Sequence, residues 1–201
     1  MIVRSASGAS FSRDRRWRYL LWRRWDAGKP AANFLMLNPS TADEVRLDPS
    51  CSRARDYAER WGYGALIVTN LFGWRATKPL QLIAAGDPMG RGNDAAILAA
   101  AREAAIVVCA WGNHGAYRGR SAEAVQMLRK ACVPLHALRV NRGGEPAHPL
   151  YLPSDLKPKT WVPARSTRGR QNVTFSSRTP APAKPARRRP ASAARSRSRR
   201  G

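Results

Sequence analysis

The sequence contains no long apolar run and little cysteine. None of its apolar stretches approaches the eighteen or so residues that a membrane-spanning helix needs, and the first residues lack the apolar core of a signal peptide. The three cysteines share no CxxC spacing, and only three histidines accompany them, so no zinc pattern is present. We therefore expect a cytoplasmic protein with buried free thiols and with no membrane segment, metal or cofactor.

Acidic residues are also scarce. The chain has 13 Asp and Glu against 36 Lys and Arg, and its formal net charge is +23. Residues 164–201 hold twelve of the basic and none of the acidic residues. This segment is rich in Arg, Pro, Ser and Ala, which predicts a disordered basic tail. Arg187, Arg188 and Arg189 are its candidate nucleic-acid contacts, although codon bias alone would also enrich arginine over lysine.

The length of 201 residues suits one folded domain with a sizeable core. Short apolar runs alternate with stretches of helical periodicity, which predicts βαβ crossovers and a parallel sheet covered on both faces. The strands are expected at 33–37, 65–69, 106–110 and 133–138, and the helices at 49–61, 80–85, 93–105 and 121–131. The expected fold is a three-layer α/β/α domain over residues 1–163, with a central, mainly parallel four-stranded sheet.

An N-terminal β-hairpin is expected to precede this sheet. Residues 16–25 alternate arginines with aromatic and aliphatic side chains, which favours a strand. The following 26–30 segment reads as a turn into the strand at 33–37. Interleaved basic and aromatic residues also suit base stacking in single-stranded nucleic acid, but an edge strand with its arginines on the solvent face accounts for them as well.

Polar residues stand where the predicted parallel strands end. They are Asn38, Asn70, the 111–114 segment and, in the loop after the fourth strand, His148. The carboxyl ends of parallel strands lie at one edge of a sheet, so these side chains are expected to meet in one pocket. Two amides with one or two imidazoles, and no carboxylate dyad or thiol–imidazole pair, suit a planar hydrogen-bonding ligand such as a nucleobase.

The apolar run before Asn38 stops at Pro39, and polar residues follow it. Ser40 and Thr41 are candidate substrate contacts or simply turn residues. Asp43 and Asp48 are candidate catalytic residues that could act as a base or bind a cation, and Asp43 could equally cap a helix. Farther along, Arg75 and Lys78 could contact phosphate or be ordinary solvated charges.

The motifs MLNPST, VTNLFGWRATKP, VVCAWGNHG and HPLYL occur in this order, and together they resemble the uracil-DNA glycosylase superfamily. More narrowly, LNPSTAD with a following DPS, and WGYG with a later TNLF, closely resemble a bacterial and phage family catalogued as domain of unknown function 1643. This narrower resemblance covers about residues 15–155. The wider one implies a uracil-DNA-glycosylase-like fold.

The resemblance to the glycosylases also implies roles for individual residues. Asn38 would orient an attacking water, Asn70 would bind the edge of a flipped base, and His148 would stabilise the departing base as an anion. Leu150 or Tyr151 would wedge into the base stack. The remaining substrate-binding candidates in the 111–114 segment are Trp111, Gly112 and His114. Efficient uracil enzymes carry Asp at the position of Asn38 and an aromatic residue after the proline, and this chain has neither.

Three functions are consistent with these observations. The first is an enzyme that hydrolyses an N-glycosidic bond in nucleic acid, with DNA favoured, or in a nucleotide. The second is a non-catalytic nucleic-acid-binding module that keeps a vestigial base pocket, and asparagine at position 38 favours it. The third is an enzyme acting on a small nucleotide, for which the basic tail is irrelevant.

Overall fold

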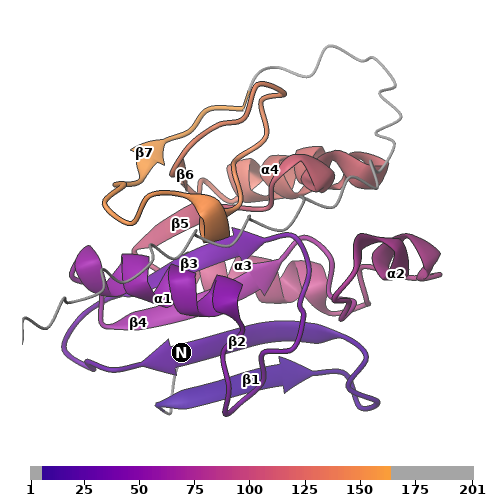
Figure 1. The fold of residues 1–201 in the computed structure, drawn as a ribbon, viewed down its shortest axis with the longest axis horizontal. Helices are drawn as coiled ribbons and strands as arrows, with labels where there is room; N and C mark the ends of the chain where they lie inside the picture. The colour runs from indigo at the N-terminus through magenta and orange to yellow at the C-terminus, as the bar shows by residue number, and fades with distance from the viewer. Residues whose placement is uncertain (1–5, 164–201) are drawn as a thin grey trace, which may run out of the picture.

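The computed structural model describes residues 6–163, which form one mixed seven-stranded sheet with helices on both faces (Figure 1). The order across the sheet is β1-β2-β4-β3-β5-β6-β7. The strands are β1 (Ser7–Phe11), β2 (Arg18–Arg24), β3 (Ala31–Met36), β4 (Ala65–Asn70), β5 (Ile106–Cys109), β6 (Leu135–Ala137) and β7 (Lys159–Thr160). No helix within residues 6–163 is both long and apolar enough to cross a membrane. Arg187, Arg188, Arg189 and the rest of the predicted tail lie outside the described residues.

The four predicted strands form the parallel centre of the sheet, in the order β4-β3-β5-β6. The expectation of a four-stranded, mainly parallel sheet is nevertheless wrong. Strand β2 adds to β4 in the antiparallel direction, β1 pairs with β2, and the two-residue β7 pairs with β6. Figure 1 shows β1 and β2 at one edge of the sheet and β6 and β7 at the other.

The N-terminal hairpin also differs from the expected one. The segment that was expected to pair with the first parallel strand is β2, and it pairs instead with β4, with Trp22 opposite Ile67. The hairpin is made by β1 and β2. Strand β1 has the sequence SGASF, which is too poor in apolar side chains to stand out by periodicity.

The helices lie close to their expected positions. They are α1 (Pro49–Arg60), α2 (Pro79–Ala84), α3 (Asn93–Glu103) and α4 (Arg120–Lys130), with the short 3₁₀ segments η1 (Asn113–Gly119) and η2 (Pro149–Tyr151). Asp48 is the N-cap of α1 and accepts a hydrogen bond from the Cys51 amide at 2.8 Å. Gly62 follows the end of α1 with a φ of 86°, which is the conformation that glycine adopts after a helix.

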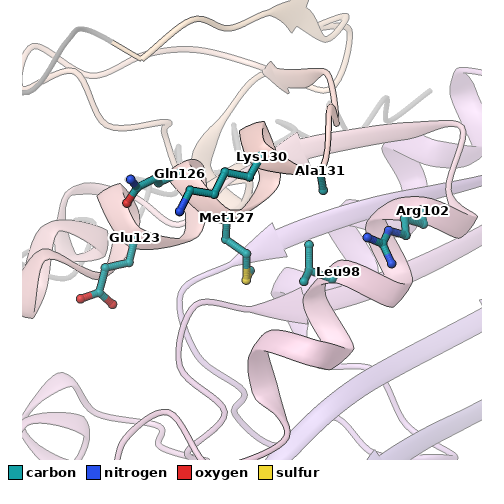
Figure 2. Close-up of a pocket in the computed structure, with 7 residues that line it drawn as sticks. All are labelled: Leu98, Arg102, Glu123, Gln126, Met127, Lys130 and Ala131. Atoms are coloured by element: carbon teal, nitrogen blue, oxygen red, sulfur yellow. The ribbon is translucent and has the colours of Figure 1, made fainter.

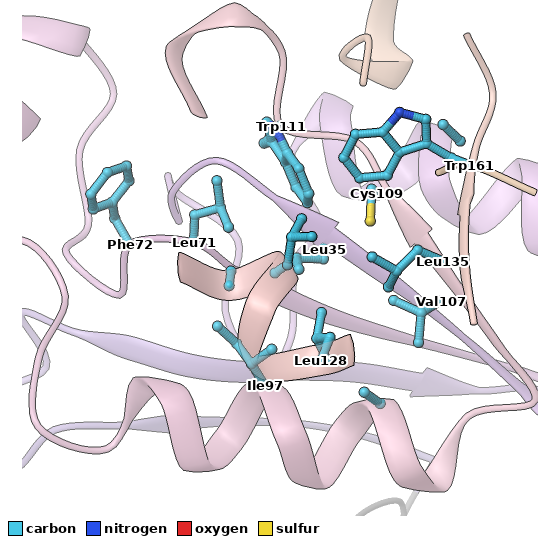
Figure 3. Close-up of a cluster of buried hydrophobic side chains, with 14 of the residues drawn as sticks. Leu35, Leu71, Phe72, Ile97, Val107, Cys109, Trp111, Leu128, Leu135 and Trp161 are labelled. Atoms are coloured by element: carbon cyan, nitrogen blue, oxygen red, sulfur yellow. The ribbon is translucent and has the colours of Figure 1, made fainter. Parts of the chain in front are cut away.

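Successive residues of β3 point to opposite faces of the sheet and build two cores. Leu35 packs with α3 and α4, including Ile97 and Leu128 (Figure 3). Phe34 packs on the other face, where Tyr57 of α1 joins it. Each of these side chains is at most 1% exposed, and burying a side chain of this size contributes roughly 1.5–3 kcal/mol.

This topology changes direction between the carboxyl ends of β3 and β5. The chain leaves β3 through α1 toward β4, whereas it leaves β5 through α4 toward β6, which lies on the opposite side. In open α/β sheets, ligands bind beyond the carboxyl ends of the strands near such a change of direction. The loop after β6 returns to this edge, because the Gly112 amide donates to the Pro146 oxygen at 2.8 Å.

Candidate functional site

A cavity of about 220 Å³ opens at the carboxyl-terminal edge of β3 and β4. It brings together five of the residues singled out from the sequence: Asn38, Ser40, Asp48, Asn70 and His148. These residues come from the end of β3, the start of α1, the end of β4 and the loop after β6. The cavity is also lined by Arg18, Met36, Leu37, Ser50, Cys51, Ala76 and Thr77.

The amide of Asn38 is held in one orientation at this cavity. Its Nδ2 donates to the backbone oxygens of Pro39 at 2.9 Å and Ala76 at 2.8 Å. Both amide hydrogens are thereby engaged, and within residues 6–163 no group donates to its Oδ1. Asn38 therefore contributes a hydrogen-bond acceptor to the site.

Asn70 ends β4 and is only 2% exposed. Its Oδ1 accepts a hydrogen bond from the Arg18 guanidinium at 3.1 Å, so its Nδ2 is the group left to donate. The strand end itself is fixed by Asn93 of α3, whose Nδ2 donates to the backbone oxygens of Asn70 and Leu71 at 2.9 and 3.0 Å. Asn70 therefore contributes a donor where Asn38 contributes an acceptor.

Arg18 is a site residue that the sequence analysis missed. It is 1% exposed, although the arginines of this segment were expected on the solvent face. The pairing of β1 with β2 shifts register between Ser10 and Phe11, opposite the start of β2, and this irregularity breaks the simple alternation of faces. A bulge of this kind leaves no signal in the sequence pattern.

Asp48 and Cys51 line the α1 side of the cavity. One carboxylate oxygen of Asp48 caps the helix, and the residue lines the cavity. Burial raises the pKa of the Cys51 thiol to about 12; Arg18 lowers it and Asp48 raises it further. Cys51 is therefore a neutral thiol at physiological pH and cannot serve as a nucleophile there.

His148 reaches the cavity from the residue before η2. Its Nδ1 accepts a long hydrogen bond from the Leu150 amide at 3.4 Å, which leaves the proton of the neutral ring on Nε2. Burial lowers the pKa of His148, although the nearby charge of Asp48 opposes this shift. The imidazole is therefore a neutral hydrogen-bond donor at pH 7.

The other candidates after β5 lie outside the cavity lining. Trp111 is buried in the core (Figure 3). Its Nε1 donates to a Glu145 carboxylate oxygen. Gly112 has a φ of 73° and lies against His148, because a methyl group added to it would be 3.6 Å from the His148 Cβ. His114 is half-buried in η1, where burial lowers its pKa.

Asp43 and the residues after His148 also lie outside the cavity lining. Asp43 does not cap a helix: its carboxylate accepts from the amides of Val45 and Arg46 at 2.9 and 2.8 Å and so closes a turn. Leu150 is half-buried, and Tyr151 is 83% exposed. Both follow His148 directly in η2.

A larger surface depression of about 560 Å³ adjoins the cavity and shares Ser40, Ala76 and Thr77 with it. Thr41, Trp74 and Arg75 contribute to this depression. The Arg75 guanidinium donates to the backbone oxygens of Ser40 and Arg15, and no carboxylate within residues 6–163 forms an ion pair with it. Lys78 is exposed at the N-cap of α2.

A separate pocket of about 400 Å³ lies between α3 and α4 (Figure 2). Leu98 and Met127 form its apolar part, and Arg102, Glu123 and Lys130 surround it. It contains none of the residues predicted from the strand ends. In the described part of the chain, no group of three or more His, Cys, Asp or Glu side chains is arranged to hold a metal ion.

Comparison with known proteins supports one assignment. No curated protein and no solved structure matches the chain. A family model described as "Protein of unknown function (DUF1643)" matches residues 18–150, which is more than half of the chain. The matched span begins at Arg18 and ends two residues after His148, so it includes every residue that lines the cavity. The chain belongs to this family, DUF1643.

Proposed function

We propose that the protein recognises a nucleobase rotated out of a nucleic acid, with DNA favoured, and hydrolyses its N-glycosidic bond. The observation that carries this proposal is that four groups line one small cavity: an amide that offers an acceptor, an amide that offers a donor, a carboxylate and a neutral imidazole. Its volume is below the roughly 300–1,000 Å³ of sites for drug-sized ligands. That size favours a single heterocycle as the bound group.

The resemblance to the uracil-DNA glycosylase superfamily supports the same proposal. The motifs that carry it contain Asn38, Asn70 and His148 in that order, and these three residues line the cavity. In this proposal the Nδ2 of Asn70 donates to an oxygen of the base. The base is held edge-on between this donor and the opposite, acceptor side of the cavity.

Asp48 is the proposed general base. In this proposal, the Asp48 carboxylate oxygen that does not cap α1 accepts a proton from a water molecule oriented by the Oδ1 of Asn38. The oxygen of that water bonds to the sugar C1′. The C1′–N bond breaks, and its electron pair leaves with the base. The Nε2 hydrogen of His148 then donates to the anionic base, which takes up a proton after departure. The products are the free base and a sugar with a new hydroxyl group.

The variant Asp48→Asn tests this assignment with little risk to folding, since asparagine also caps helices well. We expect base release from a panel of modified single strands and duplexes to fall by about 100- to 10,000-fold, with binding retained. Asp56→Asn, on the exposed side of the same helix, is the matched control and should release base at the wild-type rate. Equal rates for wild type and Asp48→Asn would exclude Asp48 as the base.

The second candidate function is a non-catalytic nucleic-acid-binding module. It is favoured by Asn38, because an amide whose two hydrogens are bound to backbone oxygens can orient a water molecule but cannot take its proton. The same assay separates the two functions. Binding of the panel by the wild type without release from any member would support the module and contradict the hydrolase.

A further inference from the structure

We infer that Arg18 is a positioning residue that fixes the Asn70 side-chain amide with its NH₂ group toward the cavity. The NH₂ group can then donate a hydrogen bond to an oxygen of the ligand. The inference deepens the proposed function and rests on it for the identity of the ligand as a base. Arg18 is the first residue of β2 and of the family match.

The orientation of Asn70 follows from the chemistry of its partner. A guanidinium has five N–H donors and no acceptor. Its Nη2 lies 3.1 Å from the Asn70 Oδ1, and a flipped amide would place two donors against each other. The Asn70 side chain is buried, so it has no space to escape that conflict. Only Nδ2 can then face a ligand.

The surroundings of Arg18 indicate what the ligand must supply. Its Nη1 donates to the Ala42 backbone oxygen at 3.0 Å, but its buried Nε makes no hydrogen bond within the described residues. None of the ion pairs in residues 6–163 includes Arg18. Burial lowers the pKa of Arg18, and the nearby charge of Asp48 offsets that shift only in part. An oxygen acceptor bound in the cavity would reduce the remaining cost of burying the cation.

Arg23 is a natural control for these properties. It lies on the same strand and is 8% exposed. Its guanidinium donates to two backbone oxygens, those of Trp22 and Asp43, where that of Arg18 donates to one backbone oxygen and to Asn70. Among residues 6–163 it binds no side-chain amide, and it does not line the cavity. Substitution of Arg23 therefore removes a buried arginine from β2 without touching Asn70.

The first arm of the experiment follows the Asn70 side-chain NH₂ signals by ¹⁵N NMR, assigned with Asn70→Asp. We expect two resolved hydrogens in the wild type, in Arg18→Lys and in Arg23→Met. In Arg18→Met they should shift or merge as the amide is released. If Arg18→Met does not fold, Arg18→Gln replaces it. Signals that do not respond to any Arg18 substitution would overturn the inference, whatever the ligand is.

The second arm measures binding of two matched pairs, uracil with cytosine and hypoxanthine with adenine, and of inorganic phosphate. Within each matched pair, the first compound carries an oxo group where the second carries an amino group. We expect the oxo member to bind about tenfold more tightly or better, and this ratio to fall to about one in Arg18→Met but not in Arg23→Met. A preference for the amino member, or a ratio independent of Arg18, contradicts the inference.

The two arms separate the inference from the proposed function. If no base binds but phosphate binds in an Arg18-dependent manner, the role of Arg18 in turning the Asn70 NH₂ group toward the cavity is supported, and the nucleobase proposal fails. If nothing binds, the NMR arm alone decides the role of Arg18 and the nucleobase proposal again fails.

Discussion

Four buried or half-buried asparagines show how position decides the role of one residue type. Asn33 donates to the Ile67 backbone oxygen and to Thr69, and Asn93 holds the end of β4. Both satisfy the protein's own polar groups. Asn38 and Asn70 each keep one amide atom for the cavity. The sequence predicted the last two correctly as strand ends, but it contains no signal that distinguishes the hydrogen-bond partners of any of the four.

The stability of the protein should depend on pH through His148. Burial lowers its pKa below the usual 6.5, so the unfolded chain binds more protons than the folded one between the lowered pKa and 6.5. The free energy of unfolding must then rise with pH across that interval and fall on acidification. We expect His148→Gln to lose less stability than the wild type between about pH 7.5 and about pH 5 in urea denaturation.

His114 provides the comparison, because burial lowers its pKa in the same direction. Part of the acid-induced loss should therefore persist in His148→Gln and diminish further when His114→Gln is added. An identical pH dependence in wild type and His148→Gln would show that His148 is not held in its neutral form by the fold.

At the level of elements, sequence periodicity located the parallel strands and the four helices because each buries an apolar run or stripe. It failed for β1 and β7, which contain few apolar residues and depend on neighbouring strands for their pairing. It also gave β2 the wrong neighbour. The pairing of β2 with β4 depends on contacts between segments that are distant in sequence, and a local pattern does not encode them.

The turn between β2 and β3 packs closely against the start of β4 at Gly64. The Gly64 oxygen accepts from the amides of Trp25 and Asp26, and its amide donates to Pro30. A methyl group added at Gly64 would lie 2.2 Å from the Asp26 backbone oxygen. We expect Gly64→Ala to destabilise the fold by about 1–3 kcal/mol in chemical denaturation, because this backbone oxygen cannot move without displacing the turn.

Gly143 provides the matched control for that substitution. It lies in an exposed loop, and an added methyl group would meet no atom within 4 Å. Gly143→Ala should leave the denaturation midpoint nearly unchanged. A similar loss in both variants would mean that Gly64 matters through backbone freedom and not through close packing.

For the whole molecule, charge is the property that the sequence states most directly. Of the net +23, residues 164–201 supply twelve positive charges and residues 1–163 the remaining eleven. If the tail contacts phosphates, the logarithm of DNA affinity should fall steeply with the logarithm of salt concentration, by roughly 0.9 for each phosphate neutralised. Deleting residues 164–201 should reduce that slope by roughly 3 or more.

The measurement is a salt titration of binding to a short DNA by fluorescence anisotropy. Replacing Arg187, Arg188 and Arg189 together by glutamine is the milder comparison and should reduce the slope by less than the deletion does. A slope unchanged by the deletion would rule out the tail as a nucleic-acid arm and would leave Arg75 and the folded domain as the source of any affinity.

The cavity was predictable only in part at this scale. Because parallel strands end at the same edge of a sheet, the predicted topology placed Asn38, Asn70 and His148 close together. Arg18, Ser50, Cys51 and Thr77 were not expected to line it, because the segments that carry them were assigned by their local pattern alone. In each case the position depends on how a neighbouring element packs.

The cavity draws its walls from both ends of the span that the family shares, from Arg18 to His148. A molecule seated there would touch the first and the last parts of that span at once, so it could remain bound only while the entire domain is intact. Occupancy should consequently raise the melting temperature in proportion to the logarithm of ligand concentration at saturation. Heating the protein in the presence of a compound library would thus identify its natural ligand before any reaction is known.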